Sequence, residues 1–167
     1  MTDSDYFELL GLSRRWQVDR NILERNYLER SREAHPDGFV GKGTAAQRAA
    51  VELSSRINTA YRVVRDPILR AEYLVKLGGV DLDSSDPVMG ALTPSQAFLI
   101  HLIELRERLS EEGSAEVRDE IEARADQAFD EAIGAIDRAD ITTAARELVA
   151  RRYYQRFLDE VDAAEAT

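Results

Sequence analysis

The sequence predicts an all-α fold, with a helical hairpin in its first half and a three-helix bundle in its second half. Three observations support this prediction. Ala, Leu, Glu and Arg dominate the 167 residues, and these residues favour the α-helix. Alternating β-branched residues, which are typical of strands, are scarce. The prolines stand where helices should begin or end, at Pro36, Pro67, Pro87 and Pro94.

Four helices are predicted in the first half. A short one from Asp5 to Leu10 ends at Gly11, a residue common just after a helix. Asp19 can cap a second helix that runs to about Ala34. A third helix runs from about Thr44 to Arg65, and Pro67 opens the fourth. The apolar stripes expected to be buried are Ile22, Leu23, Tyr27 and Leu28 in the second helix and Val51, Ile57, Ala60, Tyr61 and Val64 in the third.

The second half begins after a segment without helical periodicity. Residues 78–93 are rich in Gly, Pro, Ser and Asp, and we expect them to form a linker between a domain at 1–77 and a domain at 94–167. Helical patterns follow at about 94–112, 114–137 and 140–162. Short connections at Gly113 and near Asp140 favour antiparallel neighbours, which predicts a three-helix bundle.

Composition limits the kinds of function that the chain can have. It is 44% hydrophobic and 32% charged, a balance typical of soluble globular proteins. No apolar stretch is long enough for a membrane span, and the acidic start does not resemble a signal peptide, so we expect a cytoplasmic protein. The absence of cysteine excludes disulfides and thiolate ligation of zinc or of an iron–sulfur cluster. With only His35 and His101 as histidines, we expect no metal site and no cofactor.

Charge is distributed unevenly along the chain. Residues 1–77 contain 13 Lys and Arg and 11 Asp and Glu, whereas residues 78–167 contain 9 and 21. An acidic second half repels phosphate backbones and argues against a nucleic-acid partner. The difference in charge suggests that the two halves bind two different proteins.

The most informative short motif is the tripeptide His35-Pro36-Asp37. Pro36 disfavours helical conformation at His35 and therefore ends the preceding helix. The imidazole and the carboxylate are then presented together from a stiff turn, in a Gly- and Pro-rich loop that extends to Gly43. The tripeptide alone is equally compatible with an ordinary helix-ending turn between two solvated polar residues.

The order of motifs around this tripeptide resembles that of the J-domain proteins, and more narrowly that of the HscB-type iron–sulfur-cluster assembly co-chaperones. The resemblance extends over nearly the whole chain. The residues that carry it are Asp5-Tyr6-Phe7 with Leu12, His35-Pro36-Asp37, Ile57 to Tyr61, Asp66 to Leu74, Phe98-Leu99, Glu104 to Glu107 and Arg156 to Leu158.

The resemblance implies that the first half activates a chaperone and is not itself an enzyme. In J-domain proteins, the tripeptide and the basic face of the preceding helix dock on a DnaK-like chaperone and trigger its ATPase. Here the implied chaperone is of the HscA type. The expected chaperone-binding residues are His35, Pro36, Asp37, Arg25 and Arg32.

Some features of this half depart from the family pattern or dilute the basic face. Gly38 stands where many J-domains have a lysine, and Asn26 stands where a basic or large polar residue is expected. The acidic residues of the same helix, Glu24, Glu29 and Glu33, either weaken the basic face or pair with its arginines. The alternative interpretation is a solvated helix face without a partner.

A mixed stripe on the first helix of the second half is the other candidate surface. Its apolar and acidic residues follow helical spacing, which is typical of a partner-binding surface with charged edges. The resemblance implies that this stripe, together with an aromatic residue of the last helix, binds an IscU-type iron–sulfur scaffold protein. The residues are Leu99, Ile100, Ile103, Glu104, Glu107, Glu111 and Phe157. The alternative is an ordinary bundle core, in which Phe98, Leu102, Leu105 and Leu109 pack inside together with some of Leu99, Ile100 and Ile103.

Three functional hypotheses follow. The first is a co-chaperone that stimulates an HscA-type ATPase, delivers an IscU-type scaffold to it and so promotes cluster transfer and maturation of iron–sulfur proteins. The second is a J-domain adaptor that recruits a different client protein. The third, a small helical enzyme with His35 and Asp37 as an acid–base pair, lacks the further groups that would complete a catalytic set.

Overall fold

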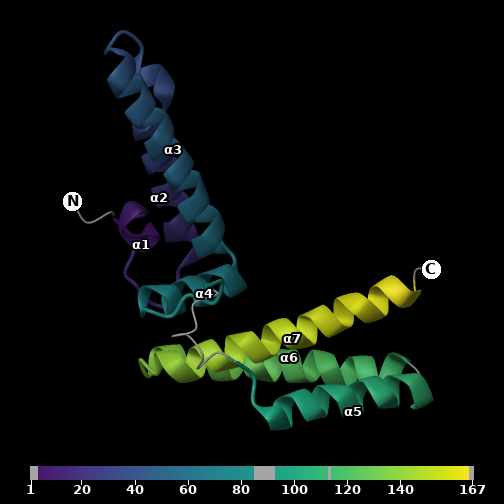
Figure 1. Ribbon diagram of the computed structural model, residues 1–167. Helices are drawn as coiled ribbons and strands as arrows, with labels where there is room; N and C mark the ends of the chain where they lie inside the picture. Colours follow the sequence, from purple (N-terminus) through teal and green to yellow (C-terminus); the bar gives the residue numbers. More distant parts are fainter. Residues whose placement is uncertain (1–3, 85–92, 113, 166–167) are drawn as a thin grey trace. The chain divides into compact units, whose positions relative to one another are not determined.

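The computed structural model describes residues 4–84, 93–112 and 114–165, and within these ranges the only regular secondary structure is helical (Figure 1). The all-α prediction is therefore confirmed. The chain divides into two compact units, Met1–Leu74 and Val75–Thr167. The described helices are α1 (Tyr6–Leu9), α2 (Arg20–Glu33), the 3₁₀ helix η1 (Pro36–Phe39), α3 (Thr44–Arg65), α4 (Pro67–Leu77), α5 (Gln96–Glu112), α6 (Ser114–Asp137) and α7 (Ile141–Glu165).

Aspartate caps fix where the helices of the first unit begin. The carboxylate of Asp5 accepts a hydrogen bond from the backbone N–H of Phe7, at 2.7 Å, and Asp19 caps α2 in the same way. Asp66 accepts from two backbone N–H groups at the start of α4, and Pro67 occupies the first helical position. These contacts satisfy N–H groups that have no partner inside the helix. The short caps are why the predicted helix starts agree closely with the structure.

Helix α3 is the central packing element of the first unit. It contacts α1, α2 and η1, and in Figure 1 α2 and α3 run side by side, joined by the loop that contains η1. Most of the predicted stripe of α3 is buried, and it packs with the apolar side chains of α1 and with one leucine of α2. The buried side chains include Phe7, Leu10, Leu23, Ile57, Ala60 and Val64.

Three side chains expected in this core are exposed instead. Ile22 is 40% exposed, Leu28 51% and Val51 54%. In α2, the residues that face α3 are Leu23 and Tyr27, which lie four positions apart on one side of the helix. Tyr27 stacks on Tyr61 of α3, with 4.0 Å between the ring centroids. A residue adjacent to Tyr27, such as Leu28, is rotated by about 100° and points away from α3.

Small residues line the contact between α6 and α7 in the second unit. These buried side chains let the two helices approach closely along most of their length. They are Ala125, Ala128, Ala132 and Ala135 on α6 and Ala144 and Ala145 on α7. Helix α5 packs beside α6, so the second unit is a three-helix bundle (Figure 1). In the described part of the chain, no helix is long and apolar enough to cross a membrane.

The first residues of the predicted linker are attached to the second unit. Lys76 pairs with Asp81 at 2.8 Å, and Arg152 of α7 pairs with Asp83 at 2.9 Å. Residues 85–92 of the linker and the connection at Gly113 lie outside the described residues. The boundaries 1–77, 78–93 and 94–167 stay a prediction.

Candidate partner-binding surfaces

The tripeptide is held in a tight turn at the end of α2. His35 caps η1, and its Nδ1 atom accepts a hydrogen bond from the backbone N–H of Asp37 at 3.3 Å. Pro36 occupies the first turn of η1. The side chains of His35 and Asp37 are 60% and 88% exposed. An imidazole that accepts at Nδ1 carries its hydrogen at Nε2. The turn therefore presents a hydrogen-bond donor, a proline ring and a carboxylate to a partner.

Arg25 and Arg32 lie along the exposed side of α2 that leads to this turn. Two of the three acidic residues that could weaken this basic face are bound to other groups. Glu24 accepts a hydrogen bond from the hydroxyl of Tyr61 at 3.0 Å, and Glu33 pairs with Arg30 at 3.1 Å. The charge of Glu33 is thus partly compensated by Arg30, and Arg25 and Arg32 give this face its positive character.

The structure explains one of the two departures from the family pattern. The side-chain amide of Asn26 donates a hydrogen bond to the backbone carbonyl of Leu10 at 2.8 Å, so Asn26 fastens α2 to the end of α1. It is therefore unavailable to the basic face. Gly38 lies in open space, because a Cβ atom added there would have no neighbour within 4 Å. Nothing in the fold of this loop requires a glycine at that position.

Helix α5 has two apolar faces, and the structure separates them. One face packs in the bundle core, where Leu105 is 1% exposed. Its partly buried neighbours are those of the bundle-core alternative, namely Phe98, Leu102 and Leu109. The other face is solvent-exposed and consists of Leu99, Ile100 and Ile103, at 40%, 48% and 56%, with the exposed residues Glu104 and Glu107 beside them. The side chain of Glu111 lies outside the described part of the structure.

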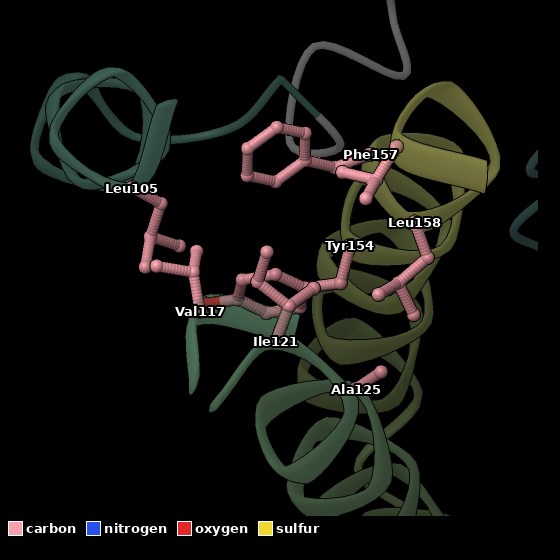
Figure 2. Packing of buried hydrophobic residues seen from close by; sticks show 8 residues of the cluster. Leu105, Val117, Ile121, Ala125, Tyr154, Phe157 and Leu158 are labelled. Carbon is pink, nitrogen blue, oxygen red and sulfur yellow. The ribbon is translucent and has the colours of Figure 1, made fainter. Parts of the chain in front are cut away.

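Phe157 differs from the sequence-based expectation. Its side chain is only 5% exposed and belongs to the buried cluster that contains Leu105 and Ile121 (Figure 2). The guanidinium of Arg106 lies over its ring, 5.3 Å from the centroid, and also pairs with Glu160 at 2.6 Å. Phe157 is therefore a core residue beneath the edge of α5 and not part of the exposed face.

Ion pairs fix α5 on both sides. Arg106 binds Glu160 of α7, and Arg108 binds Glu120 of α6 at 2.6 Å. Hydrogen bonding from Arg108 lowers the pKa of Glu120. Each pair is partly exposed, and such pairs contribute modestly to stability. The packing of Leu105 in the buried cluster decides which face of α5 points away from the bundle, and these ion pairs lie at its edges.

Among the residues that the structure describes, no group of three or more His, Cys, Asp or Glu side chains is arranged to hold a metal ion. Sequence reasoning singled out a stripe of α5 and the turn after α2, and their assignment as binding surfaces stays a prediction. It did not identify Leu28, which it assigned to the core although the structure leaves that side chain 51% exposed.

A family model and a curated relative match this chain. Residues 94–162 match the family model described as the HSCB C-terminal oligomerisation domain. The chain is 38% identical over 107 residues to the co-chaperone protein HscB of Proteus mirabilis (strain HI4320). That match covers 64% of this chain and 60% of the Proteus protein, so the chain spans about three fifths of that relative's length.

Two solved structures are similar over nearly the whole chain. The crystal structure of human co-chaperone protein HscB superimposes with a TM-score of 0.75 at 26% identity, over 99% of this chain and 84% of the human one. The chaperone HscB from Vibrio cholerae has a TM-score of 0.72 at 24% identity, over 98% of both chains, which shows the shared fold. Together, these likenesses show that residues 94–162 match the HscB C-terminal domain and that the chain as a whole is similar to co-chaperones named HscB.

Proposed function

We propose that this chain is a J-domain co-chaperone that stimulates the ATPase of a DnaK-like chaperone of the HscA type and delivers an IscU-type iron–sulfur scaffold protein to it. The coarser part of this proposal, a co-chaperone of iron–sulfur-cluster assembly, is supported by the likeness to HscB proteins. The named partners are inferred from the resemblance and from the two surfaces described above.

The chaperone-binding surface is the turn after α2 with the basic face that leads to it. Arg25 and Arg32 supply positive charge that attracts an acidic partner and speeds encounter. His35 supplies a hydrogen-bond donor at Nε2 and Asp37 supplies an acceptor carboxylate, both presented from the same turn. ATP hydrolysis takes place in the chaperone, and this turn acts by stabilising the conformation of the chaperone that hydrolyses ATP.

The exposed aliphatic row of α5 is the observation that carries the proposal. A leucine and two isoleucines between 40% and 56% exposed on one helix face are unusual for a surface that meets only water. Glu104 and Glu107 border this row, so the expected partner offers an apolar patch with a basic edge. A scaffold protein with such a patch is the client that the family resemblance implies.

Delivery follows from having both surfaces in one chain. A scaffold bound to α5 is held close to the chaperone that binds the turn after α2. Tethering raises the effective concentration of the scaffold near the chaperone to about the millimolar range. The co-chaperone then increases both the rate of ATP hydrolysis and the fraction of chaperone that captures the scaffold.

The proposal is tested by the steady-state ATPase of the cognate HscA-type chaperone, measured with this protein and the scaffold added separately and together. His35→Gln should abolish stimulation without changing the far-ultraviolet circular dichroism spectrum, because the side chain is exposed. Ile103→Asp should retain the stimulation by the co-chaperone alone and remove the additional effect of the scaffold. Leu69→Asp is the matched control, since Leu69 is an exposed leucine of the first unit, on α4.

Each outcome has a separate meaning. Stimulation that increases further with scaffold and depends on both His35 and Ile103 supports the proposal. Stimulation that is indifferent to scaffold contradicts delivery and favours an adaptor for a different client. No stimulation of the chaperone by the unmodified protein would overturn the assignment of the turn after α2.

A further inference from the structure

Leu28 lies in the middle of the basic face of α2. Arg25, Leu28 and Arg32 are separated by three and four positions, so they form one continuous row along the helix. All three side chains are exposed, and Leu28 is the most apolar of them, with 51% of its surface in contact with solvent. His35 follows Arg32 by a further three residues and continues from the end of this row.

Leu28 does not pack in the core of the first unit. Helix α2 contacts α3 through Leu23, which is 1% exposed, and through Tyr27, which stacks on Tyr61. The hydroxyl of Tyr27 also donates to the side-chain carbonyl of Asn58 at 3.0 Å. These contacts fix which side of α2 faces α3. Leu28 is rotated by about 100° from Tyr27 and therefore belongs to the side with the arginines.

We propose that Leu28 is the apolar anchor of the chaperone-binding face, inserted into an apolar notch bordered by carboxylates on the DnaK-like chaperone. This inference rests on the proposed function and adds a specificity-determining residue to it. Binding energy at protein interfaces concentrates in a central apolar side chain that is fully desolvated, while surrounding charges steer and orient the partner. The row of Arg25, Leu28 and Arg32 has this arrangement.

The charges around this row favour a protein as its binding partner over a nucleic acid or a membrane. Arg25 and Arg32 favour an acidic partner, but the exposed carboxylates of Glu29 and Asp37 lie on the same helix and on the turn that follows it. A continuous polyanion, such as a nucleic acid or an anionic membrane surface, would be repelled by these two carboxylates. A protein surface with discrete acidic groups around an apolar notch can pair with Arg25 and Arg32 while placing no negative charge against Glu29 and Asp37.

The test compares Leu28→Gln, Leu28→Met and the unmodified protein in ATPase titrations with the HscA-type chaperone at two salt concentrations. Glutamine keeps the approximate length and the helix propensity of leucine but is polar, whereas methionine keeps the length, the helix propensity and the apolar character. Leu69→Gln is the control, because Leu69 is an exposed leucine on α4. Urea unfolding of each variant verifies that stability is unchanged, as expected at an exposed position.

For Leu28→Gln we expect a rise of about tenfold in the concentration that gives half-maximal stimulation, with the same maximal ATPase rate at saturation. The salt dependence should equal that of the unmodified protein, whereas Arg25→Ala should reduce it, because only the arginine contributes an ionic contact. Leu28→Met and Leu69→Gln should titrate like the unmodified protein.

The inference is overturned if Leu28→Gln titrates within about twofold of the unmodified protein while His35→Gln abolishes stimulation. It is also overturned if Leu28→Gln changes the salt dependence as Arg25→Ala does. The first of these results would leave the proposed function intact. In contrast, failure of the unmodified protein to stimulate the chaperone would remove the proposed function and this inference together.

Discussion

Replacing Phe157 by alanine tests whether this residue is a structural or a binding residue. The side chain is 5% exposed and packs among Leu105, Val117 and Ile121, with the guanidinium of Arg106 5.3 Å from the ring centroid. Truncation of a buried phenylalanine to alanine costs about 3–5 kcal/mol, because apolar contacts are lost and a cavity remains. Loss of the cation–π contact with Arg106 adds about 0.5–1 kcal/mol. A domain of this size has a total stability of about 5–15 kcal/mol, so a large part would be lost.

The assay is urea unfolding followed by far-ultraviolet circular dichroism, with Phe157→Leu as a milder variant and Ile103→Ala as the exposed control. We expect Ile103→Ala to change the free energy of unfolding by less than about 0.5 kcal/mol, because Ile103 is 56% exposed. Trp16, the single tryptophan, lies in the first unit and reports on that unit separately by fluorescence. Unchanged stability of Phe157→Ala together with weakened scaffold binding would refute the burial argument and return Phe157 to the binding surface.

Three further predictions concern single positions. A lysine side chain has room at position 38. Gly38→Lys should lower the concentration of this protein that gives half-maximal chaperone stimulation by about two- to fivefold at low salt, as measured by ATPase titration. An unchanged titration would show that no acidic group of the chaperone faces this position. Burial raises the pKa of Glu147, and the nearby charge of Glu131 raises it further. Stability that depends on protonated Glu147 is therefore lost as the pH rises through the folded-state pKa of this group. Glu147→Gln should stabilise the protein near neutral pH by less than about 1 kcal/mol and have no effect in acid, as measured by urea unfolding. The opposite pH trend would contradict the direction of this pKa shift. A Cβ atom added at Gly78 would lie 2.7 Å from Cγ1 of Ile141, so Gly78→Ala should lower the free energy of unfolding by about 1–3 kcal/mol. Adding Ile141→Ala to the same chain should recover part of that loss. Strict additivity of the two changes would show that the two side chains do not collide.

Helix boundaries could be predicted because local chemistry determines them. Asp19 and Asp66 cap the helices that follow them, and Pro67 occupies the first turn, where proline is favoured. Gly11 has a φ of +63°, in the left-handed region that favours glycine at the end of α1. Each of these signals lies within a few residues of the boundary that it marks.

Which apolar face would be covered could not be predicted from periodicity. On α5, the rows of Leu105 and of Ile103 both follow helical spacing, and only the positions of α6 and α7 decide that Leu105 is buried and Ile103 exposed. The same limit explains Leu28, since only the stacking of Tyr27 on Tyr61 shows which side of α2 faces α3. The spacing of apolar residues shows that a segment is helical, but it does not show which neighbouring helix covers each of its faces.

The central claim is that one chain holds the chaperone and the scaffold at the same time. It is tested most directly by mixing two variants, His35→Gln, which retains the α5 face, and Ile103→Asp, which retains the turn after α2. The chaperone ATPase is then measured with scaffold present. The claim predicts that the mixture fails to restore the additional stimulation that scaffold gives with the unmodified protein, because tethering requires both surfaces on one molecule. Full restoration by the mixture would contradict delivery and show that the two surfaces act independently.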